Sequence, residues 1–482
     1  MKRLFTGLLA AALLSATSCI KVLEEIVVVR DATYYTNVFA YNIMQVYYLW
    51  KDEVQDQIDD WNYKDDPIQK VQSLRYKEYG REVDKWTLLT DNYQSFLGSV
   101  TGNTRSLGME LLYTYGNEEK TLVHAIVAFT YADSPARKAG LQRGDRIVAL
   151  DGQALTLKNY EELITQKILS PTSVRLSLSD GREVSLTAVQ MYEDPVVVSR
   201  TLDLAGKRIG YLLFASFTED CCKDLENAFR DFKADGIQEL VLDLRYNGGG
   251  YTSTSLALAS MIAPPEAVSA GKTFNTEVYN SYLAKKLDES SQFAPTLKVS
   301  GSQGDQTIEA GAVNPGVSKL WVIQTGRSAS ASEALICGLL PYMDVTLVGE
   351  KTYGKFCGGY LIGAQKWFNA LADDGETQIN CTEGARLCKD WGIYVMVSRY
   401  ADCNGVTRSM PDGIAADYPA QDRPLDGYQL GDPEETMLSA VLALSAGKPL
   451  PADIAATKAC PPEELPAPVL REGFGARILP RP

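Results

Sequence analysis

The sequence predicts an α/β protein of several domains, and three observations support this. From about Pro195 onward, short apolar runs alternate with segments of helical spacing, as in parallel α/β sheets. Between Leu107 and Val189 the apolar residues alternate as in half-buried strands. The chain has 482 residues with 45 % hydrophobic and 22 % charged content, which is typical of globular proteins and long enough for two to four domains.

The charge balance excludes two classes of partner. The formal net charge is −14, so we expect neither a nucleic-acid surface nor a polybasic membrane patch. An acidic surface of this kind more often serves solubility than attraction to basic substrates.

The N-terminus has the pattern of an export signal. Lys2 and Arg3 precede a short apolar run over residues 8–14, which is too short to span a bilayer. Cys19 follows small residues and resembles the lipidated cysteine of a bacterial lipoprotein box, although Ala16 stands where Leu is preferred. We expect residues 1–18 to be a signal peptide and Cys19 to carry lipid, with simple cleavage as the alternative. A lipid anchor would be the only membrane attachment.

The remaining cysteines do not predict a metal site. Eight are left after Cys19, an even number that allows disulfides in an oxidising compartment. The spacing between Cys381 and Cys403 is too irregular for a zinc ribbon, so we expect a local disulfide there and neither metal nor cofactor. Cys337 falls in an apolar helical segment and is interpreted as a core residue.

An aromatic and aliphatic stripe follows the leader. Tyr35, Phe39, Ile43, Val46 and Trp50 recur at helical spacing, which favours a packing face over a cofactor site. With the polar, turn-rich stretch that follows, residues 19–104 are predicted to form a small helical region.

The next segment predicts a hairpin. Val174 to Leu178 and Val184 to Leu186 alternate apolar and polar residues around Asp180-Gly181, a dipeptide suited to a tight turn.

Motifs in this segment resemble a PDZ domain of bacterial proteases. They are Ser134-Pro135-Ala136, Ala139-Gly140-Leu141, Gly144-Asp145 and the run from Ile147 to Gly152. The resemblance implies a PDZ domain over 105–192, with Leu107, Gly108 and Met109 in the loop that binds a peptide carboxylate. PDZ domains bind an extended chain end by strand addition, so it also implies peptide substrates or partners.

The later part of the chain predicts a parallel sheet. Apolar strands are expected at 209–214, 240–244, 320–324 and 345–348, with helices at 225–232, 256–262 and 332–340 between them. A last apolar helix falls between Gln429 and Ala446, and a Pro-rich tail runs from 449 to 482.

Ser330 lies between an expected strand and an expected helix. A serine there sits at a helix N-terminus, where free backbone N–H groups can stabilise an oxyanion during acyl transfer. The alternative is that Ser330 and the neighbouring serines simply cap the helix, with Glu333 completing a capping box.

A serine nucleophile needs a base, and the histidine content restricts the choice. The single histidine, His124, lies in an alternating strand of the PDZ-like segment and is interpreted as a partly exposed strand residue. Lysine is the known alternative when its pKa is lowered by burial or a neighbouring cation. Lys355 follows the strand after Ser330, and ends of adjacent parallel strands lie side by side.

Two motifs carry a family resemblance: Ser328-Ala329-Ser330-Ala331-Ser332-Glu333, and Thr352-Tyr353-Gly354-Lys355, whose lysine comes 25 residues after Ser330. With this spacing the chain resembles the tail-specific or C-terminal processing proteases, peptidase family S41. The resemblance implies a crotonase-like α/β core with Ser330 as nucleophile and Lys355 as base. It also implies an oxyanion hole from Gly249 and Ala331. Further family-like stretches are Asp243 to Gly250, Lys207 to Leu212 and Met410-Pro411-Asp412.

One position departs from the family. Many members carry a glutamine four residues after the lysine, and Gly359 stands there. Three explanations stay open: a Ser-Lys dyad, another polar group such as Glu350 or Gln365 orienting Lys355, or slow turnover. The glycines also fit a tight bend.

The predicted organisation is a signal peptide (1–18), a helical region (19–104), a PDZ-like domain (105–192), an S41 peptidase domain (193–428) and a C-terminal helix with a Pro-rich tail (429–482). The expected activity is peptide-bond hydrolysis through an acyl-enzyme, in the cell envelope (periplasm or outer membrane). A non-catalytic peptide-binding protein and a crotonase-like acyl-thioester enzyme are the alternatives.

Overall fold

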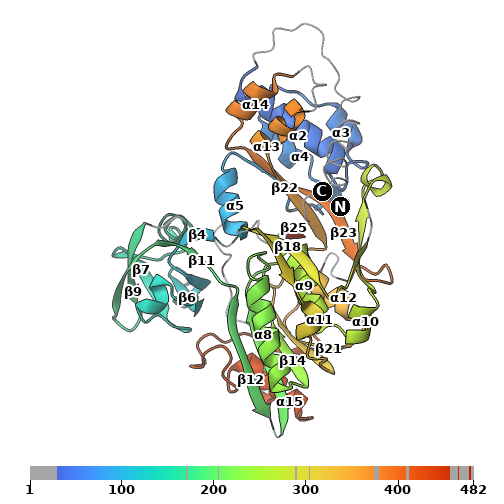
Figure 1. The fold of residues 1–482 in the computed structure, drawn as a ribbon. Coiled ribbons are helices and arrows are strands. Elements are labelled where there is room, and N and C mark those ends of the chain that lie inside the picture. The colour runs from blue at the N-terminus through green and yellow to red at the C-terminus, as the bar shows by residue number, and fades with distance from the viewer. Residues whose placement is uncertain are drawn as a thin grey trace.

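The computed structural model describes residues 30–101, 103–169, 172–204, 206–287, 290–302, 304–373, 379–408, 412–455, 465 and 477–478. Figure 1 shows three bodies: a helix-rich body at the top, a small sheet domain at the left and a sheet-and-helix core below. Cys19, Cys460, Met410 and Pro411 lie outside the described residues.

The core contains a six-stranded sheet in the order β12-β13-β14-β20-β21-β24. The strands are β12 (Val196–Leu204), β13 (Lys207–Phe214), β14 (Glu239–Asp243), β20 (Lys319–Gln324), β21 (Asp344–Gly349) and β24 (Tyr418–Pro419). All neighbours pair in parallel except β12 with β13. The predicted parallel sheet is therefore confirmed, with four expected strands in place.

Helices cover both faces of this sheet. On one face, Leu212 and Leu242 pack in the same cluster as residues of α8 (Cys222–Asp235), α9 (Thr252–Ile262) and α12 (Ala331–Leu339). On the other, Tyr211 and Val241 pack with α15 (Thr436–Ser445). Adjacent residues of a strand point to opposite faces, so these runs are buried throughout. Smaller elements are α10 (Pro265–Ser269), α11 (Ala310–Val313), α16 (Ala452–Ala455), a 3-10 helix (Leu283–Lys285) and the hairpin β18 (Leu297–Gly301) with β19 (Gly304–Ile308).

A second sheet lies above the core and was not predicted. Its order is β15-β25-β22-β23-β16-β17, with β3 also paired to β23. The strands are β3 (Leu88–Thr90), β15 (Gly250–Tyr251), β16 (Thr273–Tyr279), β17 (Ser290–Gln292), β22 (Cys357–Gly363), β23 (Gly392–Ala401) and β25 (Arg477–Ile478). Gly358 and Gly359 thus belong to a strand with a register irregularity between them, so the expected tight bend is wrong.

The N-terminal region is joined to this second sheet. The predicted stripe is confirmed as a packing face, because Tyr35, Phe39, Ile43 and Val46 of α2 (Ala32–Tyr47) are buried. Trp50 is buried beyond the helix end. Two helices from later in the chain, α13 (Ala364–Asp373) and α14 (Cys381–Leu387), pack against α2. The other elements of the N-terminal region are α3 (Gln55–Asp59), α4 (Pro67–Ser73), β1 (Lys77–Glu78), β2 (Arg81–Glu82) and α5 (Tyr93–Thr101). Because the region shares one hydrophobic cluster with the core, it is not a separate unit.

The small domain has its own sheet, in the order β10-β9-β7-β6-β5 with β8 paired to β7. Its strands are β5 (Met109–Tyr115), β6 (Val123–Thr130), β7 (Arg146–Leu150), β8 (Gln153–Ala154), β9 (Ser173–Leu178) and β10 (Glu183–Thr187). Its helices are α6 (Pro135–Lys138), α7 (Tyr160–Ile164) and a π-helix (Thr165–Leu169). The predicted hairpin is confirmed, with Leu176 opposite Val184. His124 lies half-buried on β6, as expected. Strands β4 (Asn103–Ser106) and β11 (Val189–Tyr192) pair where the chain enters and leaves the domain.

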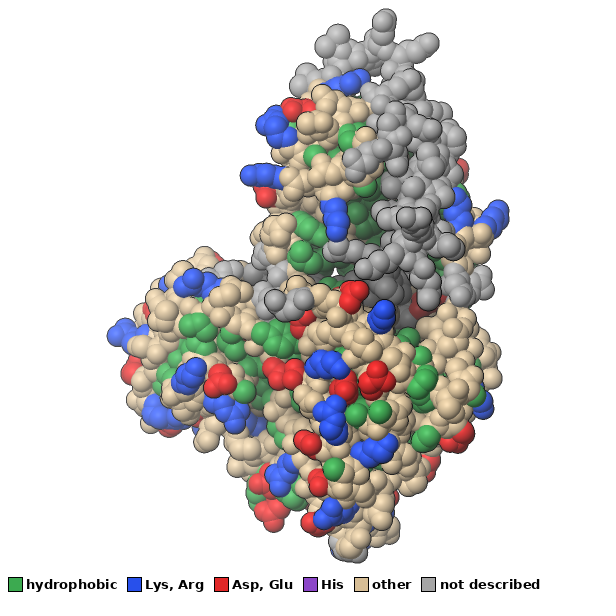
Figure 2. All heavy atoms as spheres, in the orientation of Figure 1, with side chains coloured by type: hydrophobic (Ala, Val, Ile, Leu, Met, Phe, Trp, Pro, Cys, Tyr) green, Lys and Arg blue, Asp and Glu red, His purple; other side chains and the backbone are tan. Residues whose placement is uncertain are grey.

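The cysteines differ from the expectation. Cys381, Cys388 and Cys403 form no disulfide with any cysteine of the described residues, so the expected local disulfide is wrong. Cys337 is fully buried in α12, as predicted. Within the described chain, no helix combines the length and apolar character needed to cross a membrane. On the face shown in Figure 2, acidic and basic side chains are interspersed.

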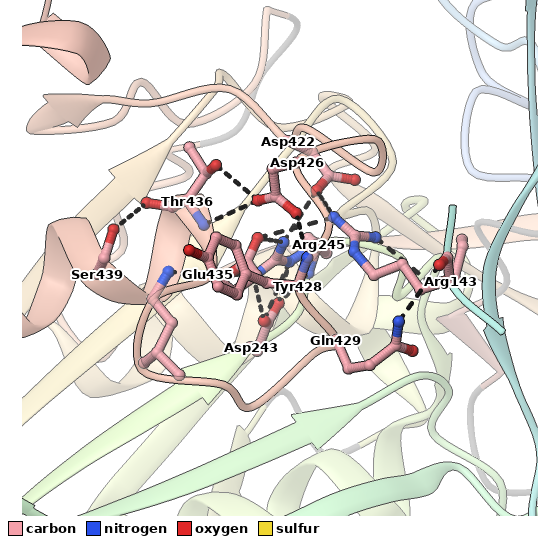
Figure 3. Close-up of polar contacts among 12 residues, drawn as sticks. Arg143, Asp243, Arg245, Asp422, Asp426, Tyr428, Gln429, Glu435, Thr436 and Ser439 are labelled. Atoms are coloured by element: carbon pink, nitrogen blue, oxygen red, sulfur yellow. Dashed lines mark hydrogen bonds and ion pairs between the residues drawn. The ribbon is translucent and has the colours of Figure 1, made fainter. Parts of the chain in front are cut away.

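A buried charge cluster joins the small domain to the core (Figure 3). Arg245 is fully buried and donates to Asp243 at 2.7 Å and to both carboxylate oxygens of Glu435, at 2.7 and 2.9 Å. Its Nη1 also lies 2.9 Å from Asp422 Oδ1. Arg143, from the small domain, forms an ion pair with the same carboxylate. Asp422 thus connects the two arginines.

We predict that Arg245→Ala destabilises the fold by about 3–5 kcal/mol, because it leaves the fully buried carboxylate of Asp243 without its cation and that of Glu435 with Arg143 alone, at 3.7 Å. Chemical denaturation measures this free energy of unfolding. The matched control is Arg230→Ala: the Arg230 side chain is exposed, and its buried partner Glu226 keeps an ion pair with Lys223 at 2.6 Å, so the substitution should cost at most about 0.5 kcal/mol. Equal effects of the two substitutions would contradict the role given to the cluster.

Candidate active site

Ser330 occupies a strained turn between β20 and α12. Its backbone has φ +61° and ψ −108°, a conformation that non-glycine residues adopt only when surrounding structure imposes it. Its side chain is fully buried, and Oγ makes no hydrogen bond within the described chain. Such strain and an unpaired buried hydroxyl are typical of functional sites rather than of packing.

The neighbouring serines have different contacts. Ser328 Oγ donates to Leu244 O at 2.8 Å, and Ser332 Oγ donates to Asn247 O at 2.9 Å. Both hold the junction to the glycine-rich loop that follows β14. Ser330 is the serine of the three whose hydroxyl has no hydrogen-bond partner within the described chain. It is nevertheless the N-cap residue of α12, and Glu333 accepts its N–H as in a capping box, so the predicted capping by Ser330 and Glu333 is confirmed at the backbone.

Glu333 connects the Ser330 turn to the loop of Lys355. Its Oε2 accepts the backbone N–H groups of both Ser330 and Lys355, each at 2.9 Å. Its Oε1 accepts from Thr352 Oγ1 at 2.6 Å and from Gly354 N–H at 2.8 Å. Since one oxygen binds both amides, the backbone nitrogens of Ser330 and Lys355 lie within about 6 Å of each other. Burial raises the pKa of Glu333 to about 7, although these four hydrogen bonds act to lower it.

Lys355 is fully buried between β21 and β22. Its Nζ donates to Tyr394 Oη at 3.3 Å and lies over the rings of Tyr394 and Trp86, 4.9 and 5.3 Å from their centroids. Burial lowers the pKa of the amine to about 8, while the nearby Cys357, Asp84 and Glu333 act to raise it. Lysine at this pKa has a substantial neutral fraction near pH 8 and can accept a proton. Ser330 Oγ and Nζ are not hydrogen bonded to each other.

The glycine-rich loop lies directly against Ser330. Gly249 has φ +107°, and a Cβ there would come within 2.9 Å of Ser330 Cβ and 3.0 Å of Ala331 N. Ala331 is the first residue of α12, so its N–H has no partner within the helix. The N–H of Gly249 donates to Asn247 Oδ1 at 2.9 Å. Both predicted oxyanion donors therefore lie beside Ser330, but Gly249 would have to release Asn247 to serve.

Gly359 has no room for a side chain. A Cβ at this position would lie 2.5 Å from Val395 O and 2.9 Å from Tyr394 Cε2. The two substitutes considered from the sequence do not orient the lysine: Gln365 is exposed on α13, and Lys355 hydrogen bonds to neither Gln365 nor Glu350.

The predicted peptide loop of the small domain lies between β4 and β5. Leu107 and Met109 are buried in the domain core. Gly108 has φ +74°, and its Cβ would overlap Ser134 Cβ at 2.1 Å, so the position requires glycine. Its N–H donates to Ser106 Oγ at 2.8 Å. The loop thus packs at the start of α6.

Several contacts connect the small domain to the site. Arg327, three residues before Ser330, pairs with Glu110 of β5 at 3.5 Å. Arg143 donates to Tyr246 Oη at 2.7 Å, and Tyr246 belongs to the glycine-rich loop. The Phe129 ring of β6 lies 5.8 Å from the Tyr246 ring.

Sequence reasoning missed three functional neighbours. Glu333 was considered only as a helix cap, although its motif position three residues after Ser330 was visible. Trp86 and Tyr394 surround the lysine amine, but they come from a loop before β3 and from β23, and no local pattern marks them. Asp412, of the family-like Met410-Pro411-Asp412, pairs with Arg81 at the surface.

Comparisons with known proteins agree with this architecture. Residues 208–419 match the model of peptidase family S41, and residues 129–176 match that of a PDZ domain. A solved structure of a Bacteroides fragilis protein assigned to the S41 proteases superposes with a TM-score of 0.64 at 21 % identity, covering 85 % of this chain and 97 % of the other. That likeness shows the fold.

Curated proteins of similar sequence align with this chain over part of their length. The chain is 27 % identical over 277 residues to the carboxyl-terminal-processing protease of Synechocystis, covering 56 % of this chain and 57 % of that protein. It is 23 % identical over 323 residues to the carboxy-terminal processing protease CtpB of Bacillus subtilis, covering 65 % and 58 %. The chain thus spans little more than half the length of these relatives. The chain therefore contains a segment over residues 208–419 that is similar to peptidase family S41, and ahead of it a segment that is similar to a PDZ domain.

Proposed function

We propose that this chain is a serine endopeptidase with Ser330 as nucleophile and Lys355 as general base. One observation carries the proposal: a strained serine with an unpaired hydroxyl and a buried lysine of lowered pKa are bound through their backbones to the same carboxylate oxygen. The unpaired hydroxyl and the buried amine do not stabilise the fold, since a buried polar group costs free energy unless it is well paired.

The chemistry follows from these groups. A side-chain movement brings Lys355 Nζ to Ser330 Oγ, and the neutral amine takes the hydroxyl proton as Oγ bonds to the peptide carbonyl carbon. The N–H of Ala331, and that of Gly249 once released by Asn247, stabilise the oxyanion. Protonated Lys355 then gives its proton to the leaving amine, forming an acyl-enzyme. Water, deprotonated by the same lysine, releases the acid and restores Ser330.

The PDZ domain supports a peptide substrate. Curated relatives are named for carboxyl-terminal processing. We infer that the loop of Leu107, Gly108 and Met109 captures a chain end and raises its effective concentration at Ser330. The contacts of Arg327 with Glu110 and of Arg143 with Tyr246 support this inference, because they join the PDZ domain to the loops around Ser330.

The location is proposed from the leader. Export with lipid on Cys19 would place the peptidase in the cell envelope, facing exported proteins. Mass spectrometry of the mature N-terminus tests this, and an unmodified, freely soluble product would refute the anchor.

A peptide-binding protein without turnover is the second candidate, favoured by Gly359 in place of glutamine. Retention of both reactive groups in one buried site speaks against it.

We predict that Ser330→Ala and Lys355→Ala each abolish cleavage of an unstructured protein, a loss of at least about 10³-fold, because nucleophile and base act as one unit. Lys351→Ala is the matched control, since Lys351 is exposed on the same loop, and it should cleave like the wild type. Gel electrophoresis and mass spectrometry of the products measure the result. A wild type that binds peptide ends but cleaves nothing would favour the binding candidate.

We also predict that kcat/KM rises with pH through a midpoint near 8. Below its pKa, Lys355 is protonated and cannot accept the serine proton; above it, the neutral amine can. A profile from pH 6 to 10 on one peptide tests this. A flat profile would contradict lysine as base, and a midpoint near 7 would point to the ionisation of Glu333 instead.

A further inference from the structure

Strand β23 leaves no room for a side chain at Gly359. A Cβ there would lie 2.5 Å from Val395 O, 2.7 Å from Met396 Cε and 2.9 Å from Tyr394 Cε2. A glutamine at this position is therefore excluded by the backbone of β23 as well as by its side chains. Any residue that orients the Lys355 amine must come from elsewhere, and Tyr394 of β23 is the candidate.

Tyr394 contacts the lysine amine in two ways. Its hydroxyl oxygen accepts a hydrogen bond from Lys355 Nζ at 3.3 Å, and its ring centroid lies 4.9 Å from the same nitrogen. The ring is fully buried and is held by Phe96, 6.0 Å away between centroids. A buried aromatic in the middle of a strand is a rigid support.

Of the groups around the Lys355 amine, Tyr394 is the one that can orient it by a hydrogen bond. Asp84, Glu333 and Cys357 are the ionisable groups whose charge acts on Lys355, but none hydrogen bonds to Nζ. The Asp84 carboxylate instead accepts from Tyr48 Oη at 2.9 Å and from the N–H groups of Trp86 and Thr87. Glu333 is bound to four other donors.

We propose that Tyr394 is the positioning residue of Lys355 and does the work that the glutamine performs in other family members. This inference rests on the proposed function. A glutamine oxygen and a tyrosine oxygen are both acceptors for an amine N–H. A neutral amine has two N–H groups and one lone pair, so binding one N–H to Tyr394 restricts the directions that the lone pair can take. Tyr394 itself exchanges no proton.

The test uses Tyr394→Phe, which keeps the ring and removes the oxygen. Labelling of Ser330 by a fluorophosphonate needs no known substrate: Oγ bonds to phosphorus, fluoride leaves, and Lys355 takes the proton. We expect the plateau rate constant at high pH to fall about tenfold, because the amine loses one orienting hydrogen bond. Its pH midpoint should also move down by about one unit, because the charged amine loses an acceptor that stabilises it.

Tyr360→Phe is the matched control, since Tyr360 is buried on the neighbouring strand and does not contact Lys355. It should keep both the plateau and the midpoint of the wild type. Partial unfolding of Tyr394→Phe would reduce the labelled fraction equally at every pH and leave the midpoint unchanged, which would overturn the positioning role. Wild-type labelling and midpoint in Tyr394→Phe would overturn it as well. Absence of labelling in the wild type would instead refute the proposed function, so the two failures are distinguishable.

Discussion

The site depends on the buried carboxylate of Glu333. Its two oxygens accept four hydrogen bonds, from the Ser330 turn on one side and from the loop of Thr352, Gly354 and Lys355 on the other. A carboxylate buried without such donors would be very costly, whereas one with four donors is a strong and directional junction. The backbone N–H groups of Ser330 and Lys355 both donate to this carboxylate, which fixes the two backbones next to each other. A movement of the side chains alone can then bring Lys355 Nζ to Ser330 Oγ.

The strain at Ser330 is consistent with this junction. A positive φ at a non-glycine residue costs on the order of 1–3 kcal/mol and persists only where the surroundings impose it. Glu333 and Gly249 confine the turn from two sides. Gly249 packs so closely against Ser330 Cβ that a side chain at position 249 would clash with it. The result is a hydroxyl presented without a partner at the start of a helix.

The second buried cluster has a wider role. Arg245 and Arg143 share Asp422, and through it the PDZ domain, the glycine-rich loop and the start of α15 are coupled. Charges buried in this way contribute little net stability as a set, but removing one member is expensive. Such a cluster specifies one arrangement of the domains around the site (Figure 3).

Much of the core could be predicted from the sequence, because its strands are continuous apolar runs separated by helices. Ser330 and Lys355 could be identified because their motifs are local and their spacing reflects one strand-to-strand crossover. The second sheet could not be predicted from the sequence, because β22 contains glycines that suggest a bend. The pairing of β22 with β23 is visible only in three dimensions. Trp86 and Tyr394 could not be predicted either, because they reach Lys355 from distant segments of the chain. For the N-terminal helices, the apolar stripe predicts that one face is buried but not which part of the protein covers it.

The most direct test of the central claim is a crystal structure of the protein after reaction with a fluorophosphonate. The account predicts phosphorus bonded to Ser330 Oγ, a phosphonyl oxygen at the N–H of Ala331, and Lys355 Nζ within about 3.2 Å of Oγ. It also predicts that Glu333 keeps its bonds to both backbones. Phosphorus on another residue, or an adduct at Ser330 with Lys355 still remote from Oγ, would contradict the assignment of nucleophile and base.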